Sequence, residues 1–230
     1  MNLEPRLKLF LYLSAVFIVC LILGDLIGGK LFELTVGKIP FVISVGMLPF
    51  PITFLLTDLI NEFYGARWAR FVTLVGFFMA VLTYAIVLVA VRVPWAPFTL
   101  EPGWGGINRA SFDNVFSGSQ RMMIASMAAY LFAQFTDIAV FHAIKRLTKD
   151  RFLWLRATGS TIVSQLIDTV VIQSIAWVGL LRADKLVSII LTSYAVKVVI
   201  AIALTPLIYA GHELVERQFQ MKPMAIEQDL

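Results

Sequence analysis

The sequence predicts an all-α integral membrane protein with six transmembrane helices and both termini in the cytoplasm. Of its 230 residues, 59% are hydrophobic and only 15% are charged, whereas a typical soluble domain has about 25% charged residues. Its mean hydropathy is +0.84, and its apolar runs are continuous and roughly 20 residues long, the length that a helix needs to cross a bilayer. Basic residues gather at the ends of these runs, as is typical of membrane edges.

We expect one domain over residues 1–230, with spans at about 9–29, 41–64, 69–91, 122–144, 158–181 and 186–209. Arg6 and Lys8 precede the first span, as basic residues precede the apolar part of a signal peptide. This apolar run is too long for a signal peptide and no cleavage site follows it, so we expect it to be retained. Pro49 and Pro51 are expected to bend or break the second span, because proline removes a backbone donor and clashes with the preceding turn.

A long connection follows the third span and covers residues 92–120. Its prolines and glycines forbid a continuing helix, and Trp95, Phe98 and Trp104 suit a membrane interface. The connection either covers a site as a lid or lies on the lipid headgroups. Residues 112–116 are expected to form a short helix before the fourth span.

Small residues recur every four positions in the fourth span, at Ala125, Ala129 and Ala133, and Asp137 comes next in this series. Such spacing lets helices approach closely, so Asp137 is expected on a face that contacts another helix. The fifth span repeats the arrangement and ends it with Asp168. A polar tail follows the sixth span, and we expect it to be loosely ordered.

An even number of spans places both termini and the connections two–three and four–five on one side. That side carries eleven Lys and Arg residues and the other side carries seven, and the densest group lies between the fourth and fifth spans. The excess of basic residues favours a cytoplasmic location for both termini.

The polar residues inside the spans are the candidate functional residues, because a charge within a bilayer is costly unless it faces a polar interior. They are Asp58, Asn61, Glu62, Gln134, Asp137, Gln165, Asp168 and Lys197. One interpretation is a set of structural ion pairs, for example Lys197 with Asp168 or Asp137. The other is a polar cavity that binds a substrate rich in hydrogen-bond donors.

Several chemistries are not indicated by the sequence. It has no Cys/His spacing for a metal, no phosphate-binding loop and no hydrolase motif. We expect no enzyme activity, no cofactor and no metal. The net charge of +4 is modest and does not indicate nucleic-acid binding.

Residues 50–65 read FPITFLLTDLINEFYG, residues 134–141 read QFTDIAVF, and residues 154–161 read WLRATGST. Together these stretches closely resemble the queuosine precursor transporter family, also called the vitamin uptake transporter family. The resemblance implies a multi-pass importer in the bacterial inner membrane. Its substrates would be the deazapurines 7-cyano-7-deazaguanine and 7-aminomethyl-7-deazaguanine, salvaged for transfer RNA modification. The implied fold is similar to the six-helix substrate-binding subunits of energy-coupling-factor transporters, and the family is thought to work without a dedicated ATPase.

Carboxylates and amides can accept the N–H donors of a guanine-like base. Glu62, Asp137 and Asp168 are the leading expected ligands, whereas Asp58 can instead hold the second span by pairing with Lys197. Candidate aromatic residues for stacking on the base are Phe54, Tyr64, Tyr130 and Phe135. The alternatives are a transporter of another vitamin or nucleobase and a non-transporting membrane protein whose charges only assemble its helices. A homodimer and a separate ATPase module stay open, as does the energy source.

Overall fold

The computed structural model describes residues 4–28, 30–36, 39–116, 120–179 and 182–224. The predicted helical class is confirmed. The helices are α1 (Pro5–Ile27), α2 (Phe50–Arg92), α3 (Arg109–Phe116), α4 (Gln120–Leu147), α5 (Leu153–Trp177), α6 (Ala183–Ala203) and α7 (Thr205–Phe219), with 3₁₀ turns at Val45–Met47 and Pro97–Leu100. One small antiparallel hairpin, β1 (Leu31–Val36) with β2 (Ile39–Ser44), joins α1 to α2.

The beginning of α2 differs from the prediction. The second span was expected from about residue 41, but residues 39–44 pair as β2 and the helix begins at Phe50. Pro49 caps the helix and Pro51 lies in its first turn, where the missing backbone N–H of proline has no helical partner to lose. The expected bend at these prolines is therefore wrong, because they start the helix instead of breaking it.

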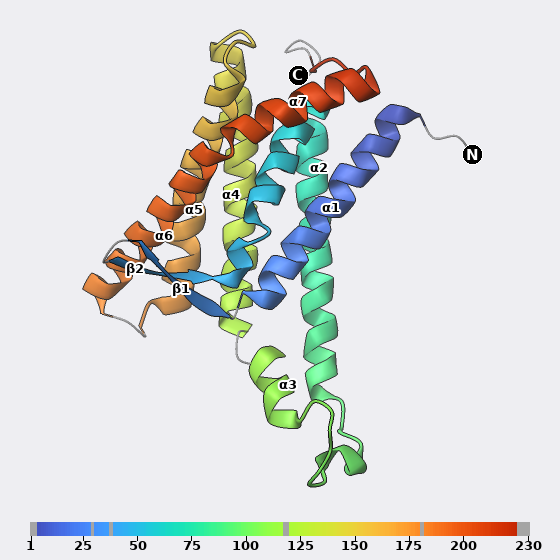
Figure 1. Cartoon of the computed structure of the whole chain (residues 1–230), viewed down its shortest axis with the longest axis vertical. Coiled ribbons are helices and arrows are strands. Elements are labelled where there is room, and N and C mark those ends of the chain that lie inside the picture. The colour runs from blue at the N-terminus through green and yellow to red at the C-terminus, as the bar shows by residue number, and fades with distance from the viewer. Residues whose placement is uncertain (1–3, 29, 37–38, 117–119, 180–181, 225–230) are drawn as a thin grey trace.

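The break in α2 lies at Gly65, which has φ 82° and ψ 175°. This conformation is essentially restricted to glycine. The chain reverses there, so that α2 consists of a first arm (50–64) and a second arm (66–92) that run in opposite directions (Figure 1). Its 43 residues would measure about 65 Å as one straight helix, roughly twice the thickness of the hydrocarbon core.

By length and hydropathy, four stretches of the described chain are candidate membrane spans: Pro5–Ile27, Val45–Arg92, Met123–Leu147 and Ala183–Ala203. The third of these lies in α4, which packs closely against α5, as the small-residue spacing predicts. Ala125, Ala129 and Ala157 are fully buried there. Many large apolar side chains, such as Ile86 and Val199, are exposed, as expected for a surface that faces lipid.

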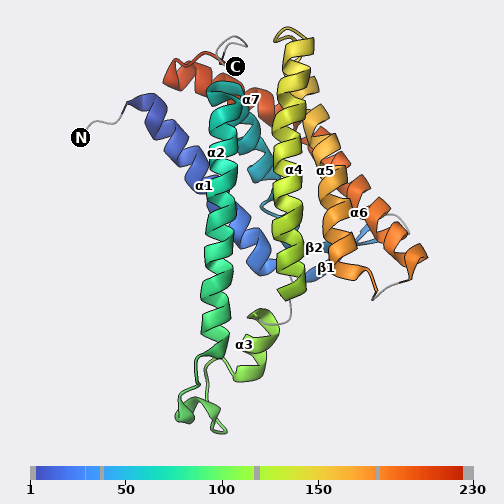
Figure 2. The same cartoon turned by 180° about the vertical axis from the view of Figure 1, so that it is seen from behind.

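The sixth span was expected to continue to about residue 209, but the helix is interrupted at Leu204, ahead of Pro206. α7 then lies across the end of the bundle that also holds both termini (Figures 1 and 2). The expectation of a loose tail is wrong for residues 210–224. Met224 donates its backbone N–H to the carbonyl of Glu62 over 2.8 Å. Residues 225–230 of the tail lie outside the described residues.

The connection after α2 lies at the opposite end of the molecule (Figures 1 and 2). It contains α3, which confirms the short helix expected at residues 112–116. Trp95 packs edge-on against Phe112, with ring centres 5.6 Å apart. The role of this connection as a lid stays a prediction, and residues 117–119 lie outside the described part of the chain.

Candidate functional site

The polar residues inside the bundle form three groups along the first arm of α2. Nearest the termini is the charged layer, made of Glu62, Lys145, Asp150, Arg156 and His212. Next comes the acceptor cluster, made of Asp58, Asn61, Gln134, Asp137, Gln165 and Thr169. Farthest from the termini is the lysine layer, made of Asp25, Ser126, Asp168 and Lys197.

Glu62 is the centre of the charged layer and is 1% exposed. Arg156 binds both of its carboxylate oxygens, and the Nε–Oε2 distance is 2.9 Å. Lys145 Nζ lies 3.6 Å from Oε2 and His212 Nε2 lies 3.8 Å from Oε1. Bidentate pairing with arginine is the geometry that best compensates a buried carboxylate. Glu62, one of the leading expected ligands, is thus neutralised by the protein itself.

Lys145 and Arg156 are functional candidates that the sequence analysis missed, because both were counted as surface charges that orient the protein. Lys145 is 1% exposed and also donates to the carbonyl of Met224 over 2.9 Å. The sequence did contain a signal for both residues. Each lies at one end of an apolar helix, and that end lies near Glu62 on α2. A carboxylate expected inside the bilayer requires such a cation.

The acceptor cluster lies between the first arm of α2, α4 and α5. Among the described residues, nine buried side-chain atoms have no hydrogen-bond partner. Seven of these nine belong to the cluster: Asp58 Oδ1 and Oδ2, Asn61 Nδ2, Gln134 Oε1, Asp137 Oδ2, Gln165 Oε1 and Thr169 Oγ1. Five of the seven are carboxylate or amide oxygens, which can only accept hydrogen bonds.

Contacts between the helices bring part of the cluster together. Ser164 on α5 donates to Asp137 Oδ1 on α4 over 3.1 Å. Asp137 in turn acts electrostatically on Asp58, on the first arm of α2. The side chain of Asn61, one turn after Asp58, lies 3.3 Å from His142 Nε2 through its Oδ1.

An unsatisfied buried polar group costs about 1–3 kcal/mol, and more if it is charged. Seven such atoms on three neighbouring helices would be a large penalty for a bundle that served only to hold itself together. Buried polar atoms without protein partners are normally satisfied by water or a ligand. The acceptor cluster is therefore suited to an occupant that supplies several hydrogen-bond donors.

The lysine layer contains a paired carboxylate. Lys197 on α6 donates to Asp168 on α5, and its Nζ lies 5.7 Å from the ring centre of Phe50. The Lys197–Asp168 pair is one of the two structural pairs that the sequence suggested. The suggested pairing of Asp58 with Lys197 is wrong, since both Asp58 oxygens lack a partner.

Three of the four candidate stacking residues either make a hydrogen bond elsewhere or are exposed. Tyr64 donates to the carbonyl of Arg6 over 2.7 Å, and Tyr130 donates to that of Thr73 over 3.0 Å. Phe135 is 38% exposed. Phe54 is buried one turn before Asp58, and its ring centre lies 4.4 Å from that of Phe50.

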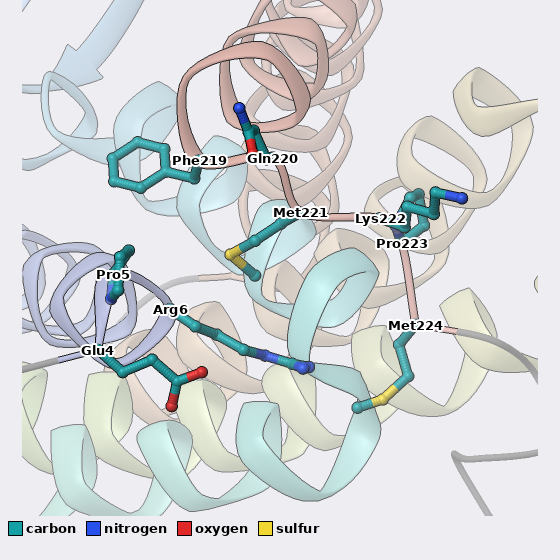
Figure 3. A pocket seen from close by; sticks show the side chains of 9 residues that line it. All are labelled: Glu4, Pro5, Arg6, Phe219, Gln220, Met221, Lys222, Pro223 and Met224. Atoms are coloured by element: carbon teal, nitrogen blue, oxygen red, sulfur yellow. The ribbon is translucent and has the colours of Figure 1, made fainter.

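A cavity of about 420 Å³ lies between the beginning of α1 and the segment after α7 (Figure 3). Its lining includes Glu4 and Arg6 on one side and Met221 and Met224 on the other. The backbone of Met224 is hydrogen-bonded to Glu62 and Lys145. The charged layer therefore borders the end of the molecule that contains this cavity.

Comparison with known proteins gives this arrangement a family. The sequence profile of the vitamin uptake transporter family matches residues 44–211. This match includes the first arm of α2 and all of α4, α5 and α6. The chain belongs to this family. It is a multi-pass membrane transporter and not an enzyme, as the sequence predicted.

Two similar proteins align with about three quarters of this chain and of their own length. A Bacillus subtilis protein named probable queuosine precursor transporter is 32% identical over 75% of this chain and 72% of its own length. The Escherichia coli queuosine precursor transporter is 29% identical over 75% of this chain and 73% of its own. No solved structure matches the chain significantly.

Proposed function

We propose that this protein imports queuosine precursors across the inner membrane of a bacterium. The acceptor cluster is the observation that carries the proposal, because its free oxygens need a donor-rich occupant inside the membrane. Two relatives in the same family are named for queuosine precursors. The substrates would be 7-cyano-7-deazaguanine and 7-aminomethyl-7-deazaguanine.

A guanine-like base fits the chemistry of the cluster. Its pairing edge presents adjacent N–H donors next to one carbonyl acceptor. Both oxygens of Asp58 are free to accept the adjacent donors, and Asn61 Nδ2 is free to donate to a carbonyl. Gln134 and Gln165 supply further acceptors, and Phe54 offers a buried ring for stacking.

The other expected ligands receive different roles in this proposal. Glu62 holds the first arm of α2 against α5 through Arg156. Asp168 and Lys197, the ion pair of the lysine layer, close the acceptor cluster on the side farther from the termini. Asp137 stays in the substrate site, where Oδ2 is free.

The proposal includes six membrane crossings: α1, the two arms of α2, α4, α5 and α6. The two arms count separately because the chain reverses at Gly65. α5 has 25 residues, enough for a crossing, and the polar residues that lower its hydropathy include Arg156, Gln165 and Asp168 of the site. α7 and both termini would then lie on the cytoplasmic side, at the end that carries most of the basic residues.

Uptake in a bacterium that depends on salvage tests the function. In a strain that lacks both its own importer and the synthesis of deazaguanine, the wild-type chain should restore queuosine in transfer RNA when 7-cyano-7-deazaguanine is supplied. Asp58→Asn should abolish this rescue, because the change replaces one acceptor oxygen of the carboxylate with an NH2 donor.

The control is Asp184→Asn, the same chemical change at an exposed position at the start of α6. It should leave the rescue intact. Equal membrane levels of the three proteins must be verified by immunoblot. Failure of the wild-type chain to restore queuosine, or full rescue by Asp58→Asn, would count against the proposal. Uptake of guanine but not of deazaguanines would favour a nucleobase transporter.

A further inference from the structure

Four of the six carboxylates in the three groups, those that the sequence analysis singled out, fall into two classes. Of the other two, Asp150 is 43% exposed and Asp25 accepts a hydrogen bond from Ser126. Glu62 and Asp168 each have a basic partner, Arg156 and Lys197. Asp58 and Asp137 have no basic side chain within ion-pair distance among the described residues, although they are 2% and 1% exposed. While the site is closed to water, ionisation of both of two adjacent buried carboxylates without a cation is costly.

We propose that Asp58 and Asp137 together hold one proton when the substrate-free transporter is open to the outside, and that this proton enters the cell with the substrate. The pair is thus the coupling site of a proton symporter. This inference rests on the proposed function, because it concerns the same site.

The unpartnered oxygens give the two carboxylates different roles: Asp58 binds the substrate and Asp137 carries the proton. Both oxygens of Asp58 are free, so this carboxylate can accept two adjacent N–H donors. Asp137 Oδ1 already accepts a hydrogen bond from Ser164, which leaves Oδ2 to carry the proton. A protonated Oδ2 is a donor, so it can bind the carbonyl oxygen of the base, in addition to the free donors Asn61 Nδ2 and Thr169 Oγ1 of the cluster.

Proton and substrate therefore favour each other's binding, because the proton supplies a further donor for the substrate carbonyl. One proton is taken up from outside with one neutral base, and both are released inside, where water that enters the open site solvates the ionised pair. The empty transporter returns without the proton and takes up the next one from outside. One positive charge moves inward in each cycle. Intramembrane carboxylates of this kind are the usual proton carriers of pumps and transporters.

Among the described residues, the charged groups around Asp58 and Asp137 form no ion pair with either carboxylate. They are Glu62 on the same arm as Asp58, His142 and Lys145 on α4, Arg156 and Asp168 on α5, His212 on α7, Lys197 on α6 and Asp25 on α1. Arg156 acts on Asp58 electrostatically, but its hydrogen bonds go to Glu62 and to the backbone of Asp150. Arg156, the cation that acts on Asp58, is thus already committed to other acceptors.

Reconstitution of the full chain into liposomes with a trapped pH-sensitive dye tests the inference. Addition of 7-cyano-7-deazaguanine outside should acidify the lumen. With the membrane potential clamped and the lumen one pH unit more alkaline, the labelled base should accumulate roughly tenfold, since one unit is worth about 1.4 kcal/mol.

Asp137→Asn is the diagnostic variant, because the amide mimics the protonated acid and cannot release a proton. It should still exchange internal for external substrate, but it should neither acidify the lumen nor accumulate the base. Asp184→Asn, which is exposed, should behave like the wild type.

The outcomes separate the two proposals. Wild-type uptake without acidification and without dependence on the pH gradient overturns the proton symport and leaves the importer standing. Acidification by Asp137→Asn also overturns the symport. If this variant fails to fold, the wild-type dye measurement decides alone. Absence of both uptake and exchange in the wild type overturns both proposals.

Discussion

Glu62 and Asp58 are one helical turn apart, yet the protein treats their carboxylates differently. Glu62 receives both hydrogen bonds that Arg156 can direct at a carboxylate, with Lys145 and His212 nearby. Asp58 receives none. This difference supports a structural role for Glu62 and agrees with the substrate-binding role proposed for Asp58.

Arg156→Gln should lower the free energy of unfolding by about 3–5 kcal/mol, because it leaves the buried Glu62 carboxylate without its main counter-charge. Thermal unfolding of the detergent-purified protein measures the effect. Arg182→Gln is the control, since Arg182 also pairs with a carboxylate, at 3.3 Å, but its side chain is 88% exposed. Its effect should be near zero. Equal melting temperatures for the two variants would refute the structural role of Arg156.

The sequence could predict the candidate residues at this scale but not their pairing. Spacing along a helix places Asp58 and Glu62 on one face, and it placed Asp137 correctly on a helix contact. Which carboxylate receives the arginine depends on the approach of α5 to the first arm of α2, which is a tertiary contact. Counting Arg156 and Lys145 as surface charges left Glu62 with no visible partner.

Helix α2 shows how one residue determines an element. Its two arms are joined at Gly65, and the buried side chains on either side, such as Phe63 and Ala66, pack in the core. The reversal presents the first arm to α4 and α5. The sequence predicted two spans here, but it assigned the disruption to Pro49 and Pro51, since proline is the commoner cause of a kink. A glycine with positive φ is not recognisable from spacing.

Gly65→Ala should destabilise the protein by about 1–3 kcal/mol, because a side chain at φ 82° and ψ 175° is strained. Thermal unfolding again provides the measurement. Gly105→Ala is a matched control, since an added Cβ there meets nothing within 4 Å and its φ is not positive. A Gly65→Ala variant as stable as this control would contradict the reversal at Gly65.

At the scale of the whole molecule, both termini, α7 and the α4–α5 connection lie at one end, and the connection containing α3 lies at the other (Figures 1 and 2). The helical class and the grouping of the ends follow from hydropathy and an even number of crossings. The hairpin of β1 and β2 and the docking of residues 220–224 do not, because they depend on backbone pairing with distant segments.

Single cysteines test the proposed orientation, on a background in which Cys20, the one cysteine of the chain, is replaced by alanine. Glu101→Cys lies in the exposed connection after α2, and Arg151→Cys lies in the exposed connection before α5. A membrane-impermeant maleimide should label the first in intact bacteria and the second only after the membrane is opened. Labelling of Arg151→Cys in intact cells would contradict cytoplasmic termini.

The central claim is that the unpartnered oxygens around Asp58 bind a donor-rich base, and ligand-induced stabilisation in detergent tests it most directly. At about 100 times its dissociation constant, 7-cyano-7-deazaguanine should add about 2.7 kcal/mol to the stability of the wild-type protein. The same addition should leave Asp58→Asn unchanged and should stabilise Asp184→Asn like the wild type. No stabilisation of the wild type, or equal stabilisation of Asp58→Asn, would contradict the claim.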